Sequence, residues 1–292
     1  MTGWAGAQRP RLQPEVFRLL RDLVNTHAGL EFPEDALYAF ERRLGERVAA
    51  LGLESFSDYY QYLRLQPTGA SELDELVDLL TTKETYFFRQ EYQLNAFRYE
   101  LLPMLARENA RSQRLTIWSA GCATGEEAYT LAICVLESRL FREWEVRIIG
   151  SDISRRSVAA ARRGVYRAYA FRTTPPDLKS VYFEERADGA HVVDEVKKLC
   201  HFGQLNLLDF GKAAIVGRVN AVMCRNVLIY FDVRSKKKVI ENLYERLLPG
   251  GYLLLGHSES LWNVSTAFEL VHLQDDLVYR KPAPAERGAM GH

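Results

Sequence analysis

A glycine-containing turn followed by two glutamates is the part of the sequence that points most directly to chemistry. Residues 115–119 form a short β-rich run that leads through Gly121 and Gly125 into Glu126 and Glu127, where a helical stretch begins. A turn of this kind after the first strand cradles a cofactor in doubly wound α/β folds. Glycine allows tight turns and close approach of a ligand. The turn alone is a weak signal, because many α/β proteins use such glycines only for packing.

The two glutamates narrow the choice of ligand. In a dinucleotide site the helix N-terminus receives a pyrophosphate, which two carboxylates in the first turn would repel. No lysine completes a phosphate-binding loop. Carboxylates suit a ligand with positive charge, and S-adenosylmethionine carries a sulfonium and an ammonium group. The alternative is that Glu126 and Glu127 only cap the helix, whose dipole favours acids there.

A second acidic position follows the next expected strand. Residues 146–151 form a β-rich run that ends at Asp152. An acid at this strand end is placed to accept hydrogen bonds from both hydroxyls of a ribose. The alternative is that Asp152 caps the next helix. Ser154 can fill that role, which leaves Asp152 for a ligand.

Polar residues also follow a later strand, over residues 221–224. Asn206 and the run CRNVLIYF at residues 224–231 lie where α/β sheets bind ligands, beyond the carboxyl ends of strands. Enzymes that methylate amines carry an Asn/Asp-Pro-Pro-aromatic run here, which this chain lacks. Arg225 and Tyr230 instead suit a carboxylate acceptor.

The elements that must position these residues change character near residue 114. Helical spacing dominates before it, with Ser57 expected as the N-cap of a third helix and Gly52 as a stop signal. Short β-rich runs alternate with helices after it, which predicts a mostly parallel sheet covered by helices. We expect a helical domain at 12–79, a linker at 80–90, an α/β domain at 91–281 with a small β insertion at about 164–202 and a hairpin at 270–280, and a disordered tail at 282–292.

Composition excludes several classes of protein. The 292 residues hold 38 Lys and Arg against 38 Asp and Glu, so the basic surplus of a nucleic-acid binder is missing. The four cysteines form no C-x-x-C pair, which favours reduced thiols and no metal site. The N-terminal residues lack a signal peptide, and no apolar run is long enough to span a bilayer. We therefore expect a cytoplasmic protein without membrane insertion.

Taken together, these blocks resemble the chemotaxis receptor methyltransferases (CheR). The resemblance covers about residues 14–281 and is carried by an ordered set of blocks, which is far more specific than the glycine turn alone. The blocks are LLTTKETYFFR at 79–89, WSAGCATGEEAYT at 118–130, SDIS at 151–154, CRNVLIYFD at 224–232 and LPGGYLLLGHSE at 248–259. The resemblance implies an all-α N-terminal domain and a Rossmann-like class I methyltransferase domain with an inserted β-subdomain.

The resemblance also implies a set of functional residues. Arg89 and Tyr230 correspond to the polar groups nearest the transferred methyl, and Lys83 stands where the family commonly has Asn. Phe87 and Phe88 are expected to pack and fix the linker. Contacts to S-adenosylmethionine, or to its product S-adenosylhomocysteine, fall on Thr85, Arg89, Glu127, Asp152, Asn206, Leu207, Cys224 and Arg225, with Asn226 beside them.

The family's activity is formation of glutamate γ-methyl esters on the cytoplasmic domain of methyl-accepting chemotaxis receptors. Two alternatives stay open, a non-catalytic module that binds S-adenosylmethionine and a methyltransferase for small molecules or nucleic acid. The presence of Arg89 and Tyr230 favours activity, and the zero net charge counts against nucleic acid.

Docking on the receptor is the last expectation. Family members place a basic helix on the acidic receptor, and some also bind a pentapeptide at the receptor C-terminus. Arg42, Arg43 and Arg47 are the candidates for a basic face, although a mixed solvated face is an equal alternative. The expected hairpin turn at Asp188 and Gly189 is short, so we predict docking without the pentapeptide.

Overall fold

The structure, a computed structural model, describes residues 10–283. The expected tail at 282–292 lies outside the described residues except for its first two. Contacts divide the chain into two units. The N-terminal unit runs to Thr82 and also takes Tyr230–Ser235, and the larger unit holds Lys83–Ile229 and the chain from Lys236 onward.

The N-terminal unit is all-α. Helix α1 buries Phe17, Leu20 and Val24 on one face. Phe17 packs edge-on against Phe40, with 5.0 Å between ring centroids. The helices are α1 (Pro14–Ala28), a 3₁₀ turn (Glu34–Ala36), α2 (Leu37–Ala50), α3 (Phe56–Leu65) and α4 (Gly69–Leu80).

The N-cap predicted for α3 was wrong by two residues. Helix α3 begins at Phe56, and its cap is Ser55, whose Oγ accepts from the Asp58 amide at 3.1 Å. Ser55 has the extended backbone that an N-cap needs, whereas Ser57 is already inside the helix. The stop near Gly52 is confirmed, since α2 ends at Ala50 and Gly52 has φ of 70°.

The expected basic face of α2 does not form as a set of three free cations. Arg47 makes a two-pronged ion pair with the buried Glu72, at 2.8 and 2.5 Å, and the Arg43 guanidinium donates to the Leu80 carbonyl. Glu72 also accepts from the buried Tyr59 hydroxyl at 2.9 Å. Only Arg42 is exposed. The unit uses two of these arginines for its own packing: Arg47 supplies the charge that the buried Glu72 carboxylate needs, and Arg43 satisfies a backbone carbonyl.

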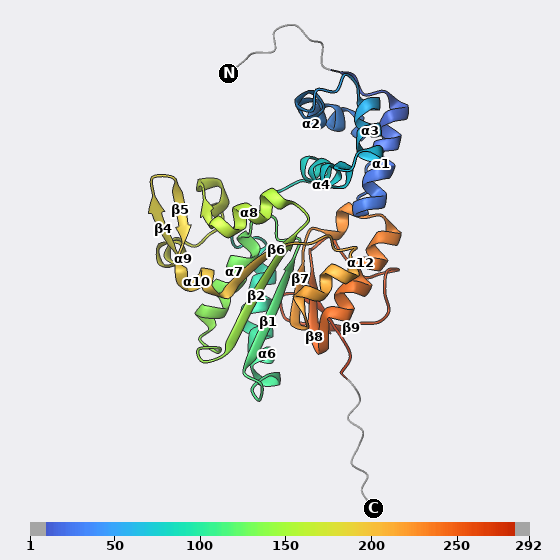
Figure 1. Ribbon diagram of the computed structural model, residues 1–292. Coiled ribbons are helices and arrows are strands. Elements are labelled where there is room, and N and C mark those ends of the chain that lie inside the picture. Colours follow the sequence, from blue (N-terminus) through green and yellow to red (C-terminus); the bar gives the residue numbers. More distant parts are fainter. Residues whose placement is uncertain (1–9, 284–292) are drawn as a thin grey trace, which may run out of the picture. The chain divides into compact units, whose positions relative to one another are not determined.

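The larger unit is built on a seven-stranded, mostly parallel sheet, which confirms the predicted fold class (Figure 1). Its order is β6-β2-β1-β7-β8-β10-β9, with β9 and β10 antiparallel, so the terminal hairpin is also confirmed. The strands are β1 (Arg114–Ala120), β2 (Glu145–Asp152), β6 (Cys200–Gln204), β7 (Val219–Cys224), β8 (Leu247–Leu255), β9 (Glu269–His272) and β10 (Leu277–Arg280).

Helices follow the strands in the manner of a doubly wound fold. Helix α7 contacts β1 and β2, and α8 and α10 contact β6. Trp118 of β1 is fully buried and donates from Nε1 to Ser151 Oγ at 2.9 Å. The helices are α5 (Glu91–Asn95), a π turn (Ala96–Leu101), α6 (Leu102–Glu108), α7 (Glu126–Ser138), α8 (Arg155–Arg163), α9 (Pro176–Tyr182), α10 (Asp194–Leu199), α11 (Phe210–Ala213) and α12 (Val233–Arg246), with short 3₁₀ turns at Ala168–Phe171, Ala214–Val216 and Leu228–Tyr230.

A separate antiparallel sheet confirms that a small β element is inserted between β2 and β7. It has the order β3-β5-β4, from β3 (Val165–Tyr166), β4 (Phe183–Arg186) and β5 (Gly189–Val192). Two details differ from expectation. Strand β6, whose first residues fall in the expected insertion, pairs with β2 in the main sheet. Arg186 pairs with Gly189, so the two-residue turn holds Ala187 and Asp188, one position earlier than predicted.

Residues 83–90 of the expected linker at 80–90 are fixed by aromatic packing, as expected for Phe87 and Phe88. The buried Phe87 ring lies against Tyr166, Phe171 and Phe183, with centroids 4.8 to 5.1 Å away. Its amide donates to the Ala170 carbonyl at 2.9 Å, and the Phe88 amide donates to Thr130 Oγ1 at 3.2 Å. These residues are therefore part of the α/β unit, whereas residues 80–82 group with the N-terminal unit.

Within residues 10–283, the structure contains no helix whose length and apolar character would let it cross a membrane.

Candidate functional site

The turn between β1 and α7 needs its glycines for close contact. Gly121, Ala123 and Gly125 all have positive φ, at 81°, 45° and 98°. A Cβ on Gly121 would lie 2.4 Å from Val227 Cγ2, and one on Gly125 would lie 2.8 Å from Ala161 Cβ. A side chain at Gly121 would displace the loop that holds Val227, and one at Gly125 would displace helix α8, so the turn needs glycine at both positions.

The two glutamates of the turn have different partners. Glu126 is buried and accepts from Thr124 Oγ1 at 2.7 and 2.9 Å. Glu127 accepts from Ser119 Oγ at 2.7 Å and faces Arg225 Nη1 at 3.4 Å. Burial raises the pKa of both carboxyls, and for Glu127 the charge of Arg225 opposes that rise. Glu126 thus serves the turn itself, and Glu127 is part of a charged centre.

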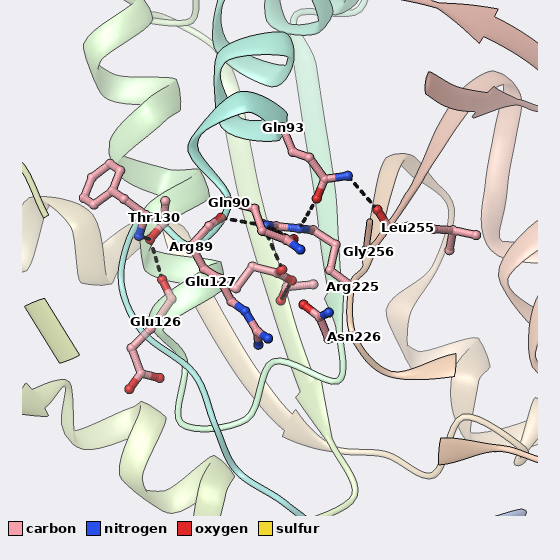
Figure 2. A network of polar contacts seen from close by, with 12 residues as sticks. Arg89, Gln90, Gln93, Glu126, Glu127, Thr130, Arg225, Asn226, Leu255 and Gly256 are labelled. Atoms are coloured by element: carbon pink, nitrogen blue, oxygen red, sulfur yellow. Dashed lines mark hydrogen bonds and ion pairs between the residues drawn. The ribbon is translucent and has the colours of Figure 1, made fainter. Parts of the chain in front are cut away.

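Arg225, directly after β7, is the centre of this network (Figure 2). Its side chain is only 3% exposed. Nη2 donates to the Arg89 carbonyl and to Gln90 Oε1, both at 2.6 Å, and Nε donates to Gln93 Oε1 at 3.0 Å. Burial lowers the pKa of Arg225, and Glu127 works against that effect. The guanidinium therefore joins the linker, α5 and the glycine turn at one point.

Gln93 extends the network and was not predicted as a site residue. Its buried amide donates from Nε2 to the Leu255 carbonyl at 2.8 Å and to Asp276 Oδ2 at 2.9 Å, while Oε1 accepts from Arg225. Burial raises the pKa of Asp276. A glutamine on a helix gives no sequence signal for such a role, because its partners are more than 130 positions away.

Asp152 has protein partners of its own. Ser154 caps α8 as predicted, with its Oγ accepting from the Ser157 amide at 2.9 Å. That Asp152 binds a ligand stays a prediction. Oδ2 accepts from the Ala123 amide and Oδ1 from the Ser154 amide, both at 2.9 Å. These bonds fix the carboxylate at the glycine turn.

The remaining predicted cofactor residues lie in the α/β unit. Asn206 Oδ1 accepts from the Leu208 amide at 3.0 Å, and the Leu207 carbonyl accepts from Asn242 at 2.8 Å. The Cys224 thiol is buried, and burial raises its pKa well above the ordinary value. Thr85 is partly exposed in the linker beside Lys83. The four cysteines, all within this unit, are free thiols as expected.

The two predicted catalytic residues belong to different units. The Arg89 guanidinium donates to the Glu84 carbonyl at 3.0 Å and lies over the Tyr86 ring, 5.6 Å from its centroid. Tyr230 groups with the N-terminal unit, where its carbonyl accepts from the Glu31 amide at 2.8 Å, and it is 39% exposed. Their joint action on one acceptor stays a prediction.

Glu259 is a second residue that sequence reasoning did not single out. Its carboxylate accepts from the amides of Asn226 at 2.8 Å, Val227 at 2.9 Å, Ile229 at 3.2 Å and Gly256 at 2.7 Å. One side chain therefore joins the loops that follow β7 and β8. Its only sequence signal is its place at the end of the block GHSE.

These residues fit S-adenosylmethionine. Carboxylates at Glu127 and Asp152 suit a cation and a ribose, and the glycine turn brings backbone between them. Glu127 and Asp152 would bind the cofactor, with Asn206, Leu207 and Arg225 around them.

Replacing Asp152 with Ala should weaken binding of S-adenosylhomocysteine by about 2–3 kcal/mol, because two ribose hydrogen bonds are lost. Calorimetry on the purified variant measures this. Asp152→Asn is a partial control for the backbone bonds, since it keeps one of the two acceptor oxygens that the Ala123 and Ser154 amides use. Unchanged affinity in a folded Asp152→Ala protein would remove Asp152 from the ribose site.

Comparison with known proteins agrees with this geometry. The family described as "CheR methyltransferase, SAM binding domain" matches residues 83–277, and "CheR methyltransferase, all-alpha domain" matches residues 15–81. The chain is 34% identical over 268 residues to chemotaxis protein methyltransferase 2 of Vibrio cholerae serotype O1, covering 91% of this chain and 92% of that protein. It is 32% identical over 270 residues to chemotaxis protein methyltransferase 1 of Pseudomonas aeruginosa, covering 90% and 97%.

The glycine turn and the Glu127–Arg225 pair, in which the Arg225 side chain is buried, therefore lie inside a match that extends over both units. The chain belongs to the CheR methyltransferase family, with the all-α domain and the S-adenosylmethionine-binding domain that define it.

Proposed function

We propose that this protein transfers the methyl group of S-adenosylmethionine to glutamate side chains of methyl-accepting chemotaxis receptors, which makes it a protein-glutamate O-methyltransferase. The observation that carries the proposal is the pair of carboxylates, Glu127 and Asp152, at the glycine turn beside Arg225 in a chain of this family. Relatives that share about a third of its residues are named chemotaxis protein methyltransferases.

Methyl transfer to a glutamate carboxylate needs no acid–base catalysis by the protein. A glutamate carboxylate is already ionised at neutral pH and needs no general base. When bound, S-adenosylmethionine supplies a methyl group activated by a sulfonium. The acceptor oxygen forms the new bond to carbon while the pair of the carbon–sulfur bond goes to sulfur, and no proton moves. The residues of the chain align the acceptor and exclude water.

Arg89 and Tyr230 are the residues proposed to do this. The Arg89 guanidinium orients a carboxylate, either that of the acceptor or that of the cofactor. Tyr230 steadies the acceptor or the sulfonium through its hydroxyl. Lys83 adds a positive charge at the position where the family commonly has Asn.

Transfer of labelled methyl groups to receptor-enriched membranes tests the function. Glutamate methyl esters release volatile methanol in base, so base-labile label is the expected result. A binding module without activity would leave the membranes unlabelled although it binds the cofactor. A methyltransferase for small molecules or nucleic acid would also leave them unlabelled and would transfer methyl groups to those acceptors instead.

We propose that the protein is cytoplasmic and that its N-terminal unit docks on the cytoplasmic domain of the receptor. Arg42 is the exposed cation of the three considered, since Arg43 and Arg47 are bonded within the unit. An exposed charge pair weakens with salt, so the receptor KM should rise with ionic strength.

A pentapeptide of the receptor-tail type, with Trp flanked by polar residues, is expected not to bind at micromolar concentration. The β4–β5 turn has only two residues, Ala187 and Asp188, and the Asp188 carboxylate is held by His191 Nε2 at 2.7 Å. Such a turn leaves little backbone to close over a peptide added to the sheet edge. Titration of a fluorescent pentapeptide measures this, and micromolar affinity would show that the β-subdomain docks after all.

A further inference from the structure

The order of the strands divides the carboxyl edge of the main sheet into two halves. Glu127 and Asp152 follow β1 and β2, and the parallel strands β7 and β8 continue the sheet on the other side of β1. In folds of this type, ligands lie beyond the carboxyl ends of the strands, at the point where the strand order reverses. With the cofactor at β1 and β2, a protein acceptor has to approach over the loops that follow β7 and β8.

These two loops carry exposed apolar side chains. Trp262, in the loop after β8, is 82% exposed, and Ile229, in the short 3₁₀ turn after β7, is 47% exposed. Both belong to the larger unit, and we call the pair the apolar rim. A single exposed apolar side chain needs no partner. Two of them on neighbouring loops of one strand edge form a surface that a protein partner can cover, and tryptophan is enriched among the residues that dominate such contacts.

The chain fixes the backbone on both sides of Trp262. The preceding Leu261 is buried, its amide donates to Tyr279 Oη at 3.1 Å, and its carbonyl accepts from the Val264 amide at 2.9 Å. The following Asn263 has φ of 58°, in the left-handed region that few residues with side chains adopt. An ordered loop loses little conformational entropy when a partner covers it. The exposure of Trp262 is therefore a property of a loop that is already ordered before a partner binds.

One carboxylate connects the two members of the apolar rim. Glu259 accepts from the Ile229 amide at 3.2 Å and from the first amide after β8 at 2.7 Å, and Trp262 lies three positions further along the chain. Gln93, which accepts from Arg225, donates to the carbonyl of the last β8 residue at 2.8 Å. The apolar rim therefore belongs to the same hydrogen-bonded framework as the buried guanidinium.

We propose that the apolar rim binds the receptor segment that carries the acceptor glutamate, with the Trp262 ring packed on an apolar side chain next to that glutamate. This rests on the proposed function and names how its substrate is recognised. A glutamate side chain is short, so the residues beside it must come over the edge of the sheet when the carboxylate reaches the methyl group. Every acceptor glutamate carries the same charge, and a contact with its neighbours gives the protein a means to choose among them.

The test is the kinetics of methyl transfer to receptor-enriched membranes. Trp262→Ala should raise the receptor KM about tenfold, the effect of removing a tryptophan that dominates an interface. The value of kcat and the affinity for S-adenosylhomocysteine should stay unchanged, because the lost contact binds the acceptor equally before and during transfer. Trp262→Tyr keeps an aromatic ring and should retain most of the affinity for the receptor.

Two controls separate an apolar contact at this edge from other effects. Ile215 is 90% exposed in the 3₁₀ turn that precedes β7, at the opposite edge of the sheet, so Ile215→Ala should keep the wild-type KM. Ionic strength separates the apolar rim from the charged contact of Arg42. Salt screens exposed charges but not an apolar contact, so the ratio of KM between Trp262→Ala and wild type should be the same at low and high salt.

The contrary outcomes are distinct. An unchanged receptor KM in Trp262→Ala would show that the receptor segment docks elsewhere. A parallel fall in kcat or in cofactor affinity would show that the loop shapes the catalytic site instead. Wild-type dimers in sedimentation velocity that Trp262→Ala abolishes, with KM unchanged, would assign the apolar rim to a second copy of the chain. Each of these overturns the inference while wild-type methylation stands, whereas the absence of receptor methylation by the wild-type protein overturns the proposed function itself.

Discussion

Arg225→Met is expected to lower the free energy of unfolding by about 3–5 kcal/mol, the usual cost of removing one partner from a buried ion pair. Methionine matches the length of the arginine stem, so little volume is lost. The variant leaves Glu127 without its counter-charge and removes the donors to Gln90, Gln93 and the Arg89 carbonyl. Urea unfolding at pH 7 measures the loss.

The loss of unfolding free energy in Arg225→Met should be smaller at acidic pH. Burial raises the pKa of Glu127 above its unfolded value, so protonation of this group favours the folded state. Its contribution is full below the ordinary glutamate pKa of about 4.3 and is lost as pH rises through the raised value. Arg225→Met raises the folded pKa of Glu127 further, because the guanidinium no longer lowers it. The difference from wild type should therefore be smaller at pH 5 than at pH 7.

The matched control is the double variant Glu127→Gln with Arg225→Met, which removes both charges. It should recover much of the stability, and its difference from the single variant Glu127→Gln should not depend on pH. An equal deficit at pH 5 and pH 7 in the single variant would show that the lost hydrogen bonds, rather than the unpaired carboxylate, set the cost.

Arg89→Ala is expected to reduce methyl transfer about a hundredfold and Tyr230→Phe about tenfold. Misplacing a reacting group by about 1 Å costs on the order of a hundredfold, and one lost hydrogen bond of about 1.4 kcal/mol costs tenfold. Both side chains are partly exposed and fill no core cavity. Stability should change by less than about 1 kcal/mol. Initial rates and thermal melts on the same preparations give both quantities.

Arg172→Ala is the control for packing of the linker. Arg172 lies over the Tyr86 ring at 3.4 Å and pairs with Glu84 at 3.2 Å, so it shares both neighbours of Arg89. A loss of rate as large as that of Arg89→Ala would assign the effect to the linker as a whole. Full turnover in both Arg89→Ala and Tyr230→Phe would place the acceptor elsewhere.

Local pattern was enough to predict the sheet and its glycine turn. The runs at 115–119, 146–151 and 221–224 became β1, β2 and β7, because buried strands read as continuous apolar runs. Strand β6 was not recognised, since its sequence CHFGQ has no such run and its place depends on pairing with β2. The hairpin turn was displaced by one residue because register depends on the strand pairing.

The site was harder to predict than the fold, because several of its residues depend on partners that are distant in the sequence. Glu127, Asp152 and Arg225 were found because they follow strands, and that position alone gives them a role. Gln93 and Glu259 act through partners that only the folded chain brings near. At Arg47 the sequence suggested a role that the structure does not support. The basic pattern made Arg47 a candidate for an exposed docking face, but its guanidinium pairs with the buried Glu72 of another helix.

The loops that follow β7 and β8 depend on each other, because both are hydrogen-bonded to the Glu259 carboxylate. We therefore expect their sequences to change together among relatives. Amides of the loop after β7 and of the loop after β8 converge on one carboxylate. A chimaera that took residues 225–229 from one relative and residues 256–259 from another would have to match both halves of that contact. Exchange of acceptor specificity between members of the family should therefore succeed when both segments travel together, and recombination points should fall outside them.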